Sequence, residues 1–116
     1  MLDKIAWHHG NSTLENPEQY KPRGTHQVAQ KAPNGWGLYD MHGNADEWCW
    51  DWFANYETGE QDNPTGPDKG WRKVTRGGTY TQLAKEMRSA RRRGSLPFQG
   101  GIAKGFRLVR TMPSSQ

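Results

Sequence analysis

Apolar and polar residues alternate in the middle of this chain, where tryptophan occupies every second position. Trp48, Trp50 and Trp52 share one parity, and Cys49 and Asp51 fall between them. Successive side chains of a β-strand point to opposite faces, so this alternation predicts a strand with a tryptophan face. A single helical turn over so few residues remains the alternative.

Two further segments, 71–75 and 106–110, combine β-branched or aromatic residues with nearby glycine and predict strands. Residues 56–70 are polar and contain prolines and glycines, which predicts an exposed turn region. Residues 13–24 have a similar composition and predict a surface loop. The predicted strands are therefore separated by long irregular connections.

The composition fits such a chain. With 116 residues it is long enough for one domain with a core of modest size. Fourteen glycines and seven prolines indicate many turns and little regular structure. Six tryptophans, four tyrosines and three phenylalanines argue against disorder, because disordered segments are poor in aromatic residues. We predict a folded, loop-rich domain anchored by aromatic side chains.

The net charge of +4 has its main local source in the cluster Arg88, Arg91, Arg92 and Arg93. Acidic residues elsewhere leave no basic face along the whole chain, so a solvated or internally paired cluster is favoured over a nucleic-acid partner. A single cysteine excludes an intrachain disulfide. No stretch reaches membrane-spanning length and no export signal is visible, so the default expectation is a soluble, cytoplasmic protein with no membrane partner.

Four short motifs follow one another along the chain. They are GLYDMHGNADEW (37–48), RGGTY (76–80), RSAR (88–91) and GFRLV (105–109). Together they resemble the formylglycine-generating enzyme family, also called the sulfatase-modifying factor family, whose blocks read roughly GLYDMxGNVWEW, RGGSY, RSAxR and GFRLVR. A single motif of this kind would be a weak signal, whereas all of them in register make the resemblance specific.

The resemblance implies an α+β, loop-rich, C-type-lectin-like fold of the formylglycine-generating-enzyme type. Residues 1–116 would form a single partial domain, truncated at its N-terminal half, because the family's RLPTEAEWEYA-like helix has no counterpart here. In the family that helix packs against the sheet that carries the motifs. We therefore expect uncovered apolar surface, and with it either a homodimer or a complementing chain that carries the N-terminal half.

The family's copper-dependent oxidase places one cysteine two residues after the tyrosine of its RGGSY block and a second cysteine five positions later. Here the first of these positions holds Gln82, and counting onward reaches Met87. A glutamine amide cannot replace a thiolate as a Cu(I) ligand or redox group. We therefore expect neither copper nor formylglycine generation, and we interpret Cys49 as a small, partly buried thiol.

The segment from Asp40 to Glu47 places a carboxylate on either side of a Gly43-Asn44 turn. Calcium takes about six to eight oxygen ligands and accepts both carboxylates and backbone carbonyls. The resemblance implies a calcium site with ligands from the side chains of Asp40 and Glu47 and from the carbonyls of Gly43 and Ala45. A turn in which both carboxylates cap backbone N–H groups without metal is the equal alternative.

The resemblance also implies a ligand-binding groove, whose residues here would be Asp46, Thr79, Tyr80, Gln82, Arg88 and Arg92. Asp46 stands where the family commonly has tryptophan, which puts charge where apolar surface is expected. The favoured function is a non-catalytic or catalytically altered member of the family that binds a ligand through the 81–104 loop region. Diversity-generating retroelements use this scaffold in that way, with variable residues between the RGG and GFR motifs.

Other functions stay open at this point. The chain could be an oxidoreductase of the formylglycine-generating type, or half of a split enzyme completed by a partner chain. It could also be a truncated relic that folds without a role. The sequence leaves open whether the ligand is a protein or a small molecule.

Overall fold

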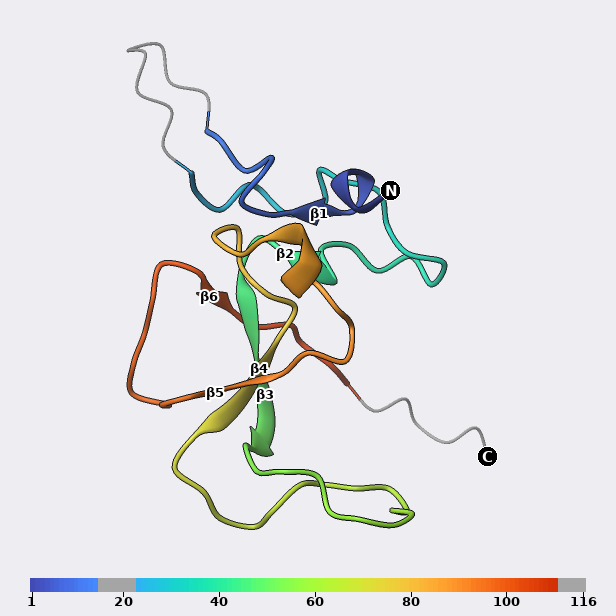
Figure 1. Ribbon diagram of the computed structural model, residues 1–116, viewed down its shortest axis with the longest axis vertical. Coiled ribbons are helices and arrows are strands. Elements are labelled where there is room, and N and C mark those ends of the chain that lie inside the picture. Colours follow the sequence, from blue (N-terminus) through green and yellow to red (C-terminus); the bar gives the residue numbers. More distant parts are fainter. Residues whose placement is uncertain (15–22, 111–116) are drawn as a thin grey trace.

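A four-stranded sheet runs through the centre of the molecule (Figure 1), whose computed structural model describes residues 1–14 and 23–110. Its strands, in spatial order, are β5 (Arg93–Ser95), β4 (Lys73–Arg76), β3 (Asp46–Trp52) and β6 (Lys104–Gly105). β4 is antiparallel to both β3 and β5, whereas β6 is parallel to β3. The long strand β3 therefore pairs with two strands that follow it in the chain, β4 on one side and β6 on the other.

A smaller parallel pair, β1 (Ala6–Trp7) and β2 (His42–Gly43), lies at the end of β3 where that strand begins (Figure 1). The helical part of the described chain consists of two short 3-10 turns, η1 (Leu2–Lys4) and η2 (Ala84–Glu86). Among the described residues, no helix has the length and apolar character needed to cross a membrane. The loop-rich architecture expected from the sequence is confirmed.

Two of the three predicted strands form. The tryptophan alternation falls within β3, and the 71–75 signal corresponds to β4. The third prediction, a strand over 106–110, is wrong, because the ladder with β3 ends at Gly105. Beyond that point Arg107 turns to the side chain of Glu47 and the carbonyl of Tyr39, so the chain leaves the sheet edge.

The two predicted loops have different outcomes. Residues 56–70 form an exposed connection between β3 and β4, as expected. Most of the predicted 13–24 loop lies outside the described residues.

The apolar core of the described residues is small, and comprises the side chains of Ala6, Val74, Tyr80 and Met87. The expectation of aromatic anchors holds for Tyr80 but fails for Trp50 and Trp71, each of which is 89% exposed. Much of the buried set is instead polar, including Asp46, Thr75 and Gln82. Hydrogen bonds therefore stabilise much of the interior of this domain, and many large apolar side chains remain exposed.

The closest backbone approach joins β2 to β1 at Gly43. Gly43 has a φ of 77°, and a Cβ atom at this position would lie 2.0 Å from the carbonyl oxygen of Trp7. Its N–H donates to the Gly77 carbonyl at 2.8 Å, and the N–H of Asn44 donates to the Trp7 carbonyl at 2.8 Å. Only glycine fits here, and its position fixes the loop that leads into β3.

Candidate functional site

Two hollows flank the start of β3, and consecutive residues of that strand face them. Asp46 lines a small hollow of about 10 Å³, beside Gly78 and Arg88. Glu47 lines a second, wider hollow of about 440 Å³, beside Asp40 and Phe106. Because side chains alternate along a strand, one short segment supplies a carboxylate to each hollow.

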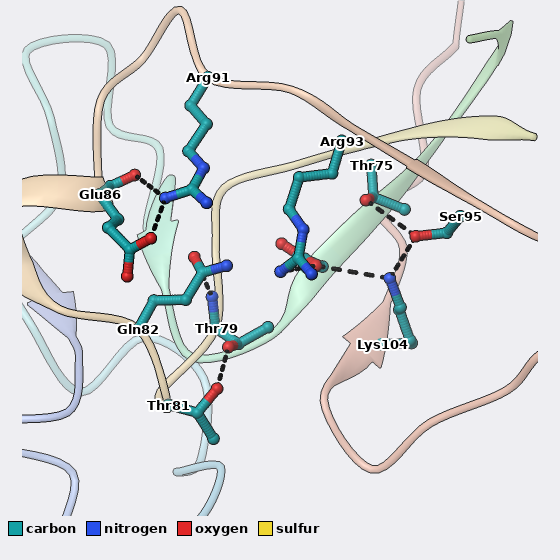
Figure 2. Close-up of polar contacts among 10 residues, drawn as sticks. Thr75, Thr79, Thr81, Gln82, Glu86, Arg91, Arg93, Ser95 and Lys104 are labelled. Carbon is teal, nitrogen blue, oxygen red and sulfur yellow. Dashed lines mark hydrogen bonds and ion pairs between the residues drawn. The ribbon is translucent and has the colours of Figure 1, made fainter.

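Asp46 is 2% exposed and lies between two cations. Its Oδ2 is 3.4 Å from Nζ of Lys104 and 3.6 Å from Nη1 of Arg93. The Lys104 ammonium also donates to Oγ of Ser95 at 2.7 Å, and that hydroxyl lies 3.3 Å from Oγ1 of Thr75 (Figure 2). This polar network links β3 to β4, β5 and β6. A buried carboxylate requires such partners, since an unpaired charge is costly away from water.

Gln82 and Met87 meet at Gly78. A Cβ atom on Gly78 would lie 2.7 Å from Oε1 of Gln82 and 2.9 Å from Sδ of Met87. The Gln82 side chain is held by the N–H of Thr79, which donates to Oε1 at 3.3 Å. The two positions that the family resemblance assigned to the cysteine pair are therefore neighbours in space. They present an amide and a thioether rather than two thiols.

The other predicted groove residues divide into two groups. Arg88 lines the small hollow and is exposed, whereas Tyr80 is buried and does not line it. Arg92 points elsewhere: it donates to the carbonyl of Ala54 at 2.5 Å and stacks 3.7 Å from the ring centre of Tyr56. The fold thus gathers Asp46, Gln82 and Arg88 and leaves Arg92 apart from them.

Several residues of the small hollow were not among the groove residues predicted from the sequence. Arg91 pairs with Glu86 at 2.7 Å, and hydrogen bonding from this guanidinium lowers the pKa of the Glu86 carboxyl. Arg93 and Lys104 are the partners of Asp46. The signal that could have found them is Asp46 itself, because a carboxylate at an apolar position in the middle of a motif calls for cations nearby.

All four predicted calcium ligands, Asp40, Gly43, Ala45 and Glu47, line the wider hollow. Oδ2 of Asp40 accepts the N–H of Ala29 at 2.7 Å, while its Oδ1 is buried without a hydrogen-bond partner among the described residues. The alternative of a capping carboxylate without metal therefore accounts for Oδ2 of Asp40 but not for Oδ1. An unpaired buried carboxylate oxygen is costly, and a cation would satisfy it.

Glu47 has a different partner. Its carboxylate accepts two hydrogen bonds from Arg107, at 2.8 and 2.5 Å, and the same guanidinium donates to the carbonyl of Tyr39 at 3.0 Å. Hydrogen bonding to Glu47 raises the pKa of Arg107. No cluster of three or more histidine, cysteine or acidic side chains suited to a metal occurs in residues 1–14 and 23–110. An ion here would need backbone carbonyls as well as the two carboxylates.

Cys49 does not join either hollow. It lies on the face of β3 opposite to Asp46 and is partly buried, as expected. Burial raises the pKa of its thiol, which disfavours the thiolate needed for nucleophilic or metal chemistry.

Comparison with known proteins shows which family this chain resembles in sequence and in fold. Residues 1–112 match the family model described as the Sulfatase-modifying factor enzyme 1-like domain. The chain is 38% identical over 91 residues to the formylglycine-generating enzyme of Bos taurus, a match that covers 75% of this chain and 24% of the enzyme. It is also 38% identical over 92 residues to the serine/threonine-protein kinase pkn1 of Chlamydia pneumoniae, of which it spans 15%.

Among solved structures, the Treponema denticola variable protein 1 superposes with a TM-score of 0.76 and 36% identity. That match covers 90% of this chain and 35% of the other. The chain therefore spans well under half the length of the relatives to which it is similar. The match of residues 1–112 to the family model, together with the fold, shows that this chain belongs to the family of the Sulfatase-modifying factor enzyme 1-like domain.

Proposed function

We propose that this chain is a non-catalytic binding domain of its family and that it recognises a ligand through the 81–104 segment. The observation that carries the proposal is the pair Gln82 and Met87, which are buried and packed on Gly78. The family resemblance assigns the redox cysteines to these two positions. Neither side chain can be cycled between thiol and disulfide. In this proposal, the packing of these two side chains on Gly78 supports the 81–104 segment.

The 81–104 segment has the properties of a recognition surface. Its base is fixed by β5 and β6, whereas Phe98 is 82% and Ile102 is 87% exposed between them. Exposed apolar side chains on a loop that rigid strands support are typical of binding sites. The similarity to the Treponema denticola variable protein 1 supports this proposal, because that name describes a protein that varies.

Selection of displayed peptides on the immobilised protein tests the proposal. Enriched peptides are expected to bind the unmodified chain and to lose at least about tenfold in affinity when Phe98 and Ile102 are both replaced by alanine, since buried apolar anchors dominate interface energy. Both side chains are exposed, so the fold should survive. Val28→Ala, on another exposed apolar residue, is the matched control. Equal losses in both variants would contradict the assignment to this segment.

We further propose that a second copy of the chain, or a complementing chain with the family's N-terminal half, covers the apolar residues left bare. Trp36, Trp50 and Trp71 are exposed to 88%, 89% and 89%. Exposed apolar side chains favour association in water. We expect light scattering to return twice the mass of the chain at micromolar concentration. A monomer over the whole accessible concentration range would exclude the homodimer and leave the complementing chain to be tested.

A calcium ion is proposed for the hollow lined by Asp40 and Glu47. The free, buried Oδ1 of Asp40 fits such a cation, and the flexible oxygen-rich coordination of calcium suits carbonyl ligands from Gly43 and Ala45. Arg107 now neutralises Glu47, so it would have to release one or both carboxylate oxygens. The ion would then brace the turn that leads into β3.

Calcium is expected to raise the midpoint of thermal unfolding, and a chelator is expected to lower it. At a concentration about a hundredfold above Kd, the native state gains about 2.7 kcal/mol. Glu47→Gln keeps the shape and removes the charge, so most of the calcium response should vanish. Glu57→Gln, in the exposed connection after β3, should leave it intact. Identical melting curves with millimolar calcium and with excess chelator would contradict the site.

A further inference from the structure

We propose that the small hollow at the base of the 81–104 segment binds a carboxylate group of an acidic ligand. The inference rests on the proposed function, because it names the ligand chemistry of that same surface. It concerns the cluster around Asp46 and Gln82 and is independent of the calcium hollow, which lies beside the next residue of β3.

Positive charge is in excess around this hollow. Four arginines line it, against the two carboxylates of Asp46 and Glu86. Glu86 is taken up by Arg91, and Asp46 is shared between Arg93 and Lys104, so one carboxylate faces two cations. A ligand anion would restore the balance.

Two of the lining arginines have no carboxylate partner among the described residues. Arg76 donates only to neutral oxygens, the carbonyl of Ser89 at 3.2 Å and the hydroxyl of Tyr56 at 3.3 Å. The side chain of Arg88 is exposed and makes no hydrogen bond or ion pair with any other residue that the structure describes. Its guanidinium is therefore free to meet a ligand without breaking an existing bond.

A neutral donor completes the set. The oxygen of the Gln82 amide is already used by the N–H of Thr79, which leaves the NH₂ group to face the hollow. Figure 2 shows this amide together with the guanidinium groups of Arg91 and Arg93 around the same space. An oxyanion placed there would accept from an amide and from guanidinium forks, which is the geometry that carboxylates favour.

Size selects a carboxylate over larger anions. A hollow of about 10 Å³ has room for the tip of one polar group, not for a whole small molecule. A planar carboxylate presents a smaller tip than a tetrahedral phosphate. The site therefore suits an aspartate or glutamate side chain of a larger ligand, whose other contacts lie on the exposed part of the segment.

Titration with an acetylated, amidated tetraglutamate peptide tests the inference, with tetraglutamine and inorganic phosphate as comparison probes. Calorimetry at low salt should show binding of tetraglutamate and none of tetraglutamine. Arg88→Gln should weaken tetraglutamate binding about fivefold or more. Arg110→Gln removes the same charge from an exposed site outside the hollow and should change it by less than about twofold. Both residues are exposed, so neither variant endangers the fold.

Asp46→Asn gives a test of opposite sign. Removing this carboxylate frees Arg93 and Lys104 from their shared partner, so tetraglutamate should bind several-fold more tightly to any Asp46→Asn protein that circular dichroism shows to be folded. Equal losses in Arg88→Gln and Arg110→Gln would overturn the inference, as would tighter binding of phosphate than of tetraglutamate. If acidic peptides fail while selected peptides still depend on Phe98 and Ile102, the carboxylate site is wrong and the binding function stands.

Discussion

Alanine at position 43 is expected to prevent the domain from folding. The added Cβ would lie 2.0 Å from the carbonyl oxygen of Trp7, and the residue has a φ of 77°. The obstacle is backbone within the β1 and β2 pair, which cannot move without losing its hydrogen bonds. We expect a loss of more than about 4 kcal/mol. Small domains are stable by roughly 5 to 15 kcal/mol, so such a loss removes most of the folded population.

Gly37→Ala separates the effect of the clash with Trp7 from the effect of the positive φ. Gly37 has nearly the same backbone angle, a φ of 76°, but a Cβ there would meet nothing within 4 Å. Its replacement should cost only the conformational term, about 1 to 2 kcal/mol. Urea unfolding followed by circular dichroism measures both variants. Similar losses at the two positions would show that the contact with Trp7 does not limit the fold.

No formylglycine is expected when the purified chain is incubated with copper, oxygen and a sulfatase-type cysteine peptide. The reaction of the family's oxidase depends on a cysteine pair, and here Gln82 and Met87 occupy the neighbouring positions at Gly78. The remaining thiol, Cys49, lies on the opposite face of β3, and burial raises its pKa. No other side chain of the chain offers a thiolate for Cu(I).

Mass spectrometry of the peptide measures this outcome, with the formylglycine-generating enzyme of Bos taurus as a positive control in the same buffer. The product of the control should be abundant, and that of this chain should not exceed a blank without protein. Aldehyde product above the blank would show that the chain retains oxidase chemistry, and the proposed binding function would then have to be abandoned.

Local patterns were enough to predict the central strand and the long connection after it. The alternation along residues 48–52 follows from the geometry of a single strand, so it does not depend on the elements that pack around that strand. The same reasoning failed for 106–110, since a strand also needs a partner, and β3 pairs with this part of the chain only through Lys104 and Gly105. The exposure of Trp50 and Trp71 was likewise not predictable, because burial depends on what covers a face.

The sequence by itself determined the family, through motifs whose spacing is fixed along the chain, and it showed that Cys49 is the single cysteine. Only the tertiary structure decided which charges meet. Asp46 pairs with Lys104, and Glu47 pairs with Arg107, across long sequence separations that the register of β3 and β6 sets. Arg92 lies over the ring of Tyr56, apart from the other arginines of the cluster, because neighbours in sequence point to different sides of an extended chain.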